Sequence, residues 1–262
     1  MIDLHTHLLP GVDDGSPTLE HSAMVLARFA TDGVRGVACT PHLSASDSVT
    51  APVEEYAALR AQLQELAPEG LILYGGWEIM LDAPGKLHRT PGLSLGSSNA
   101  VLVEWPRATV PDWGTVELSR LRGNGFIPLV AHVERYRGIS LELVRQWRAL
   151  GAVVQTDATI LVAGGDKCEF AKMMLREGLV DILASDNHGD RRTLGMAHWW
   201  LTEIGAPDQA ALLTDTNPER LLQDQEMLPV AGIVFEHGMF DRLRAWWRSR
   251  RTESVPNGSI NG

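Results

Sequence analysis

Two histidines near the first residue of the chain are the side chains best suited to chemistry. Alternate residues of a β-strand project from the same side, so His5 and His7 converge if this segment is extended. Converging imidazoles suit a divalent cation, and Asp13 and Asp14 add carboxylate oxygens shortly afterwards. A single His-x-His pair is weak evidence, because many such histidines have a structural role. The pair becomes informative only if similar side chains recur along the chain.

Such side chains do recur, each at the end of a short apolar run. Asp186 and His188 repeat the spacing of His5 and His7. For any one histidine or glutamate, a hydrogen-bonded structural role is the better interpretation. Packing alone does not select costly polar groups at the end of almost every run, so the whole set favours metal binding. The candidate ligands are His5, His7, Asp14, His42, Glu78, Glu104, His132, Asp186 and His188.

Nine ligands exceed what a single ion of four to six coordination can use, so two or three divalent ions are expected. The mixture of imidazole with carboxylate, without cysteine, favours Mn, Zn or Fe over Ca. Clustered ions of this kind serve hydrolysis. They lower the pKa of a bound water and neutralise charge on phosphoryl oxygens.

A phosphorylated substrate also needs positive side chains, and three arginines stand beside the ligand segments. Guanidinium groups bind phosphate with two parallel hydrogen bonds. For Arg135, between Glu134 and Tyr136 at a strand end, phosphate contact is favoured over a surface salt bridge. For Arg191 and Arg192 the two interpretations are equally supported.

The positions of these residues depend on an alternation of strands and helices. Apolar runs predict strands at residues 1–5, 37–39, 71–74, 101–103, 127–131, 152–155 and 181–184. Helical spacing fills most of the intervals, but residues 82–99 show no helical period, so a helix is expected to be missing there. Seven such units predict a parallel sheet in a closed or nearly closed barrel, with the ligands at the carboxyl ends of its strands.

Length, charge and composition narrow the class of protein further. A chain of 262 residues suits one large domain, and its net charge of −10 argues against a nucleic-acid surface. No apolar run is long enough to span a membrane, and no signal peptide is expected. Cys39 and Cys168 are far apart and form no metal-type spacing, so a cytoplasmic location is expected.

Four motifs together carry a resemblance to a known family. They are His5-Thr-His7-Leu-Leu-Pro-Gly-Val-Asp13-Asp14-Gly15, Thr40-Pro41-His42, His132-Val-Glu134-Arg135-Tyr136 and Ala184-Ser185-Asp186-Asn187-His188. The combination resembles the PHP (polymerase and histidinol phosphatase) superfamily. Within it, the chain is similar to the CpsB/YwqE-type protein-tyrosine phosphatases of bacterial capsule and exopolysaccharide loci, from residue 1 to about residue 222.

The resemblance implies a distorted (β/α)7 barrel of PHP type, similar to a TIM barrel, and a trinuclear site usually described with manganese. It also implies that the substrate is phosphotyrosine on a tyrosine kinase that regulates polysaccharide synthesis. All nine ligand positions of the family are filled here. The chain departs from the family at Val133, where proline is common, and Arg191 and Arg192 stand slightly before the usual arginine.

The expected mechanism is direct attack of a metal-held hydroxide on phosphorus, with Arg135 and either Arg191 or Arg192 stabilising the phosphoryl oxygens. A phosphocysteine mechanism is excluded, because it needs an arginine six positions after the cysteine. Ala45 and Met174 occupy those positions after Cys39 and Cys168. Both cysteines are therefore expected to be structural.

Two other functions are compatible with the sequence. One is a related phosphoesterase acting on a small phosphate monoester such as histidinol phosphate or a nucleotide. The other is a regulatory protein that uses its metals to recognise phosphotyrosine without turnover, which the full ligand set disfavours. A homo-oligomer is compatible with either.

The end of the chain differs from the rest. A phosphatase barrel is predicted for residues 1–224 and an extension for residues 225–262, with a flexible end. From Met239, apolar residues at helical spacing alternate with arginines, which predicts a basic, aromatic amphipathic helix over residues 239–251. Packing of this helix on the barrel is favoured over docking to an anionic membrane or a partner.

Overall fold

The structure, a computed structural model, describes residues 1–235. The basic helix predicted for residues 239–251 lies outside the described residues, and the boundary at residue 224 stays a prediction.

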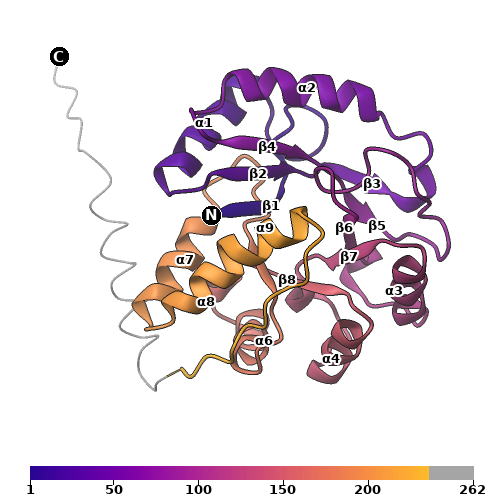
Figure 1. Cartoon of the computed structure of the whole chain (residues 1–262), viewed down its shortest axis with the longest axis vertical. Coiled ribbons are helices and arrows are strands. Elements are labelled where there is room, and N and C mark those ends of the chain that lie inside the picture. Colours follow the sequence, from indigo (N-terminus) through magenta and orange to yellow (C-terminus); the bar gives the residue numbers. More distant parts are fainter. Residues whose placement is uncertain (236–262) are drawn as a thin grey trace, which may run out of the picture.

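Parallel strands form the centre of the fold (Figure 1). In the described residues the strands are β1 (Ile2–Thr6), β2 (Gly36–Cys39), β3 (His42–Ser44), β4 (Ile72–Gly75), β5 (Glu78–Met80), β6 (Ala100–Glu104), β7 (Ile127–Val130), β8 (Val153–Asp157) and β9 (Ile182–Ala184). They pair in parallel in the orders β1-β2-β4 and β3-β5-β6-β7-β8-β9. The predicted α/β fold with a parallel sheet is confirmed.

After two of the seven predicted strands the chain is interrupted and then forms a second short strand. Thr40 and Pro41 separate β2 from β3, and Gly76 and Trp77 separate β4 from β5. Pro41 has no N–H to donate to a neighbouring strand and restricts the residue before it. The chain also crowds Leu95 at Gly76, where an added Cβ would lie 2.6 Å from the leucine side chain.

The interruptions correct one detail of the sequence analysis. His42 and Glu78 were expected just beyond the ends of strands, but each is the first residue of a new short strand, and the two pair in register across β3 and β5. The same neighbours stay paired across the interruptions, since β3 pairs with β5 as β2 pairs with β4.

The two ends of the strand order meet at β1 and β9 without a regular ladder. Beyond the end of β9, Asp186 donates its backbone N–H to the His5 carbonyl at 3.0 Å, and His7 donates to the Asn187 carbonyl at 2.7 Å. Between β4 and β6, residues of a loop complete the wall: Gly96 donates to the Gly75 carbonyl at 2.7 Å. The predicted (β/α)7 barrel is therefore distorted at these two places.

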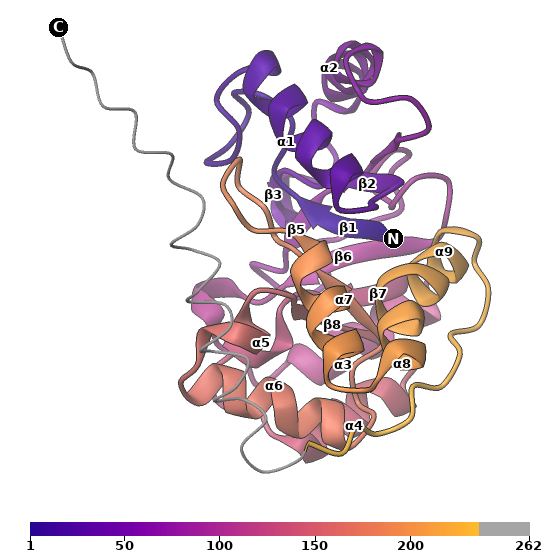
Figure 2. The same cartoon turned by 90° about the vertical axis from the view of Figure 1, so that its left-hand side faces the viewer.

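Helices cover the outside of the strands (Figures 1 and 2). They are α1 (Leu19–Thr31), α2 (Val53–Glu65), α3 (Gly114–Gly123), α4 (Leu141–Ala149), α5 (Ile160–Ala163), α6 (Asp166–Arg176), α7 (Leu194–Glu203), α8 (Pro207–Ala211) and α9 (Asn217–Leu222). As predicted, no helix lies between β5 and β6. In the described part of the chain, no helix is long and apolar enough to cross a membrane.

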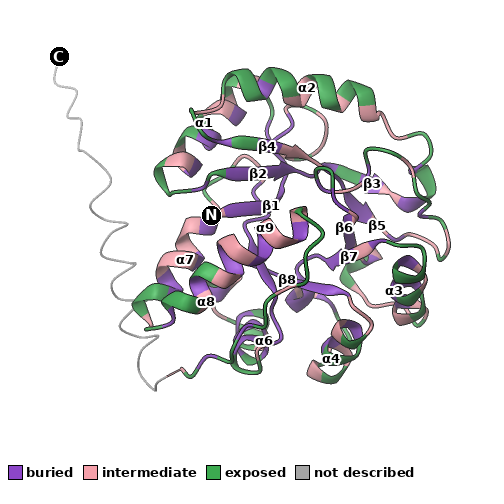
Figure 3. Ribbon diagram, viewed as in Figure 1, coloured by how far each residue is buried: buried purple, intermediate pink, exposed green. Residues whose placement is uncertain are grey.

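Burial follows this arrangement. Most strand residues are buried, with His42 of β3 and Ile72 of β4 exposed, whereas the helices expose their outer faces (Figure 3). After α9 the chain returns to the barrel, where Ile233 is buried and donates its N–H to the Leu175 carbonyl at 3.0 Å. The strands therefore form a rigid wall, and polar side chains at its carboxyl edge are held by a packed core.

Candidate metal centre

All nine candidate ligands meet at the carboxyl edge of the barrel. They form four overlapping groups in which the ligand atoms lie within 4.8 Å of one another. The groups are His7, Asp14, His42 and His188; His5, Glu78 and His132; His5, His7 and Asp186; and His42, Glu78 and Glu104. Because three to four donors define each group and residues are shared between groups, the arrangement suits more than one divalent ion.

His5 and His7 lie on the same side of the chain, as the strand alternation predicted. Their Nε2 atoms are 3.3 Å apart, and both side chains are fully buried. The two nitrogens also share Asp186 Oδ1, at 3.3 Å from His5 and 3.4 Å from His7. Ring nitrogens that face one another around a carboxylate are the arrangement expected around a cation.

Glu78 lies at the centre of the cluster. Its Oε1 atom is 2.8 Å from His132 Nε2 and 3.3 Å from His5 Nε2, and its Oε2 atom is 3.1 Å from His42 Nδ1. Burial disfavours the charge of this carboxylate, but the surrounding imidazoles hold its pKa well below the usual value. Both oxygens are therefore available as acceptors, and Glu78 belongs to two of the four groups.

Two of the candidate ligands have an unusual backbone. His132 and Asp186 have φ angles of 33° and 49°, in the left-handed region that residues with a side chain rarely adopt. Each lies two residues after the end of a strand, β7 or β9, and its side chain belongs to the cluster. Strained backbone of this kind is typical of functional sites, where the surrounding structure fixes it.

Further side chains orient the imidazoles from behind. Asp13 Oδ2 is 2.7 Å from His7 Nδ1, and Gln155 Oε1 is 3.5 Å from His5 Nδ1. The Gln155 oxygen also accepts the backbone N–H of His132 at 2.7 Å. Such outer partners fix the orientation and tautomer of a metal-binding histidine.

Asp13 and Asp14 were both expected to offer carboxylate oxygens. In the structure Asp14 alone belongs to the groups, with Oδ1 3.4 Å from the Nε2 atoms of His42 and His188. Gln155 and Asp157 were not predicted as site residues. Asp157 is the last residue of β8, and Gln155 lies two positions earlier on the same strand. The position at a strand end could have identified Asp157 from the sequence.

The charges of the cluster show what kind of ligand it accepts. Burial lowers the pKa of His7, but hydrogen bonds to Asp13, Asp186 and Glu78 raise it to about 11. Burial and the charge of Glu78 raise the pKa of Glu104 to about 7. Negative charge is thus in excess, and each shift favours added positive charge. Divalent cations fit this donor set.

The three arginines differ in their relation to the cluster. Arg135 Nη2 is 2.6 Å from Asp186 Oδ2 and also pairs with Asp157. Arg192 Nη1 is 3.3 Å from the same Asp186 oxygen, and its Nε pairs with Asp190 at 2.8 Å. Arg191 is exposed and makes no ion pair within residues 1–235. The structure therefore joins Arg135 and Arg192 to the site, but not Arg191.

Neither cysteine is suited to nucleophilic attack. Both are buried, and burial raises the pKa of the Cys39 thiol to about 12. Cys168 lies in α6 and donates to the Leu161 carbonyl at 3.4 Å. Cys39 is in a core strand, as predicted.

A ring of parallel strands with clustered imidazoles and carboxylates at its carboxyl edge defines a class of barrel proteins suited to holding several divalent cations. Within that class, the family model "Capsular polysaccharide synthesis, CpsB/CapC" matches residues 1–223. The chain belongs to the CpsB/CapC family, which confirms the resemblance found in its motifs.

Named relatives match most of the chain. Tyrosine-protein phosphatase CpsB of Streptococcus pneumoniae is 31% identical over 243 residues, covering 86% of this chain and 99% of the relative. Tyrosine-protein phosphatase YwqE of Bacillus subtilis (strain 168) is 28% identical over 196 residues, covering 72% of this chain and 77% of YwqE. A crystal structure from work on YwqE and CpsB, described as unique metal-dependent tyrosine phosphatases, matches with a TM-score of 0.71 and 25% identity. That match covers 90% of this chain and 100% of the matched chain.

Proposed function

We propose that this chain is a metal-dependent phosphatase that hydrolyses phosphotyrosine on a protein. The observation that carries the proposal is the convergence of nine imidazole and carboxylate side chains at one edge of the barrel, with two arginines beside them. The names of the CpsB and YwqE relatives support the choice of phosphotyrosine.

The nine candidate ligands would hold two or three divalent ions, for which manganese is proposed ahead of iron and zinc. Such ions lower the pKa of a bound water and neutralise charge on phosphoryl oxygens. The overlap of the groups around Glu78 and Asp186 supports more than one ion, because both carboxylates face several imidazoles.

The arginines and the walls of the site bind the phosphoryl group and exclude water. Arg135 and Arg192 bind and orient the phosphoryl group, because their guanidinium groups already lie against a carboxylate of the centre and remain partly exposed. Asp157 holds Arg135 from behind, and its Oδ1 atom is itself fixed by the Thr159 backbone N–H at 2.7 Å. The buried side of the cluster excludes bulk water, while the exposed Asp14 marks the side from which substrate enters.

The proposed substrate is a tyrosine kinase that regulates capsular or exopolysaccharide synthesis, and the proposed location is the cytoplasm. The family description, capsular polysaccharide synthesis, supports this partner. Docking near a membrane through residues 239–251 and assembly into a homo-oligomer stay predictions.

The test is a comparison of substrates on the manganese-loaded protein. A phosphotyrosine peptide should be hydrolysed with a higher kcat/KM than histidinol phosphate or a nucleoside monophosphate. Preference for a small ester would assign the same site to another phosphoesterase, and binding without turnover would make the chain a recognition protein. A Cys39→Ser, Cys168→Ser protein is the control and should retain full turnover per folded molecule.

A further inference from the structure

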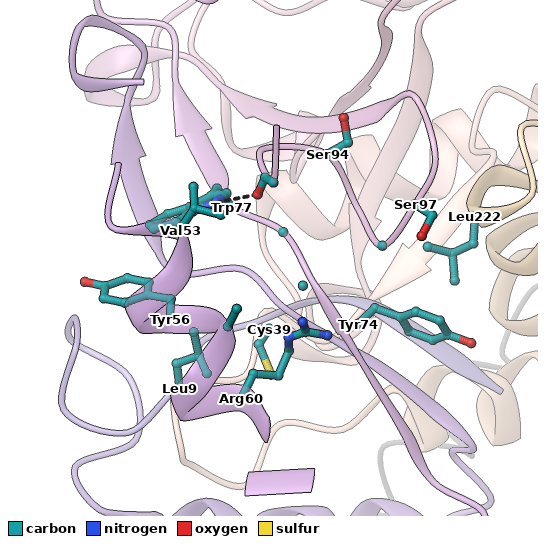
Figure 4. A pocket seen from close by; sticks show the side chains of 15 residues that line it. Leu9, Cys39, Val53, Tyr56, Arg60, Tyr74, Trp77, Ser94, Ser97 and Leu222 are labelled. Atoms are coloured by element: carbon teal, nitrogen blue, oxygen red, sulfur yellow. Dashed lines mark hydrogen bonds between the residues drawn. The ribbon is translucent and has the colours of Figure 1, made fainter. Parts of the chain in front are cut away.

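A cavity outside the metal centre lies between α2, the ends of β2 and β4, and the loop before β6. It has a volume of about 430 Å³, and its lining includes Leu222 of α9 (Figure 4). None of the nine candidate ligands lines it. Trp77, which does line it, immediately precedes Glu78, so the interruption between β4 and β5 separates the cavity from the metal centre.

Glycines keep this cavity open. Gly75, Gly76, Gly92 and Gly96 all line it. A Cβ atom added at Gly75 would lie 3.4 Å from the guanidinium carbon of Arg60, and one at Gly96 would lie 3.3 Å from the Tyr74 ring. Gly92 and Gly96 also have φ angles of 82° and 58°, which favour glycine. The backbone therefore forms the wall where side chains would otherwise fill the space.

The cavity contains one uncompensated positive charge. Arg60 reaches in from α2, and its guanidinium lies between Cys39 and Tyr74 (Figure 4). Nη1 donates to the Leu73 carbonyl at 3.1 Å, and within residues 1–235 no carboxylate pairs with this arginine. The neighbouring Cys39 thiol cannot supply the missing charge, because burial raises its pKa to about 12. A half-buried guanidinium with unused donors is suited to an anion.

The opposite part of the wall is aromatic and rigid. The rings of Tyr56 and Trp77 stack with centroids 4.9 Å apart and an interplanar angle of 22°. Trp77 is fixed further by its indole N–H, which donates to the Gly92 carbonyl at 3.0 Å. Flat aromatic surfaces beside one charged group are typical of sites for small ring-containing ligands, and the volume is within the usual range of such sites.

We propose that this cavity binds a small organic anion, composed of a single ring that carries one carboxylate or phosphate group. The anionic group pairs with Arg60, and the ring packs against Trp77 and the glycine wall. The site is separate from the proposed phosphatase site and does not depend on the metals.

The indole N–H of Trp77 provides a local signal for binding. The uniformly ¹⁵N-labelled, manganese-free full chain is titrated with benzoate, glucuronate or phenylphosphonate, and the Trp77 resonance is identified from its absence in a Trp77→Phe protein. At least one probe should shift this resonance saturably, whereas sodium sulfate at equal ionic strength should shift it less. Comparison of benzoate with phenylphosphonate identifies the preferred anionic group, and comparison with glucuronate identifies the preferred ring.

Two variants and a matched control locate the binding. Arg60→Gln should weaken binding about tenfold or more, because it removes a charge-assisted contact. Ala57→Phe, on the exposed side of α2, should fill the cavity without changing Arg60. Arg122→Gln is the control, because Arg122 also reaches from a helix to a backbone carbonyl, that of Phe126, at 3.1 Å. The proposal is overturned if no probe shifts Trp77, or if the shift persists unchanged in both Arg60→Gln and Ala57→Phe.

Discussion

Glu78 Oε1 and His132 Nε2 lie 2.8 Å apart, although 54 residues separate them in the chain. Glu78 begins β5 and His132 follows β7, so this contact crosses the intervening strand β6. It makes Glu78 the residue through which several strand ends are connected.

Replacement of Glu78 by glutamine should therefore separate metal binding from folding. Glutamine has nearly the same shape but lacks the negative charge that faces four imidazoles. Bound metal and kcat should both fall by about 100-fold or more, with a largely unchanged circular dichroism spectrum. Elemental analysis of the purified protein measures the first effect.

Glu117→Gln is the matched control for that variant. Glu117 is as buried as Glu78, but it pairs with Arg120 at 2.7 Å and lies outside the candidate metal groups. Its replacement should lower the melting temperature while metal content stays at the wild-type value. Equal metal loss in both variants would show that Glu78 acts through stability alone.

Removal of the metals should abolish turnover and lower stability together. A chelator takes away the cations that balance the excess carboxylates, so the melting temperature should fall. Added metal ion should restore the melting temperature by mass action. Manganese is expected to restore activity best, with iron and zinc tested beside it. Full activity of metal-free protein would contradict the proposed mechanism.

The arginines should differ in their effect on the rate. Arg135→Ala should retain its metals but lower kcat by about 10²–10³, because it removes a contact to the phosphoryl group in the transition state. Arg191→Ala should stay close to wild type, since this side chain is exposed and unpaired within residues 1–235. Loss of metal from Arg135→Ala would instead assign that arginine a structural role.

Asp157→Asn tests how Arg135 is held. The variant keeps the shape of the side chain but weakens its pairing with Arg135. We expect kcat to fall by about tenfold with little change in metal content, because Arg135 becomes less well positioned. Recovery of most of the rate in Asp157→Glu would distinguish charge from packing. An unchanged kcat in Asp157→Asn would exclude the positioning role.

Stability should depend on pH through Glu134. Burial, and then the charge of Asp157, raises the pKa of this carboxyl to about 8 from its ordinary value of 4.5. The folded state therefore binds a proton more tightly than the unfolded state. The contribution of Glu134 to stability is present at low pH. It is lost as the pH rises from the ordinary pKa of the carboxyl to its pKa in the folded state, by at most about 1.4 kcal/mol per pH unit.

Glu134→Gln removes that titration. The free energy of unfolding of each protein is measured by urea denaturation. The value for Glu134→Gln minus the value for wild type should increase as the pH is raised from 5 to 8. A difference between the two proteins that does not change with pH would show that Glu134 does not carry the shift.

The sequence by itself determined the reaction class and most of the candidate centre. Strand alternation is a local property, so the spacing of His5 and His7 was enough to place both imidazoles on one side. The common edge of a parallel barrel then predicted that ligands as distant as His42 and Asp186 would meet. Both predictions needed only the order of the elements along the chain.

Only the tertiary structure decided how the members of the site are related. The chain is interrupted at Pro41 and Gly76, and the alternation of side-chain directions cannot be followed across such breaks. The central position of Glu78 could therefore not be predicted from the sequence. The choice of Arg192 over its neighbour Arg191 depends on a contact to Asp186 that the loop conformation creates. Gln155 and Asp157 act behind other side chains, and contacts of this kind arise only when strands distant in the chain pack together. Local periodicity fixes the side of a strand from which a residue projects, whereas its partners are set by packing across the barrel.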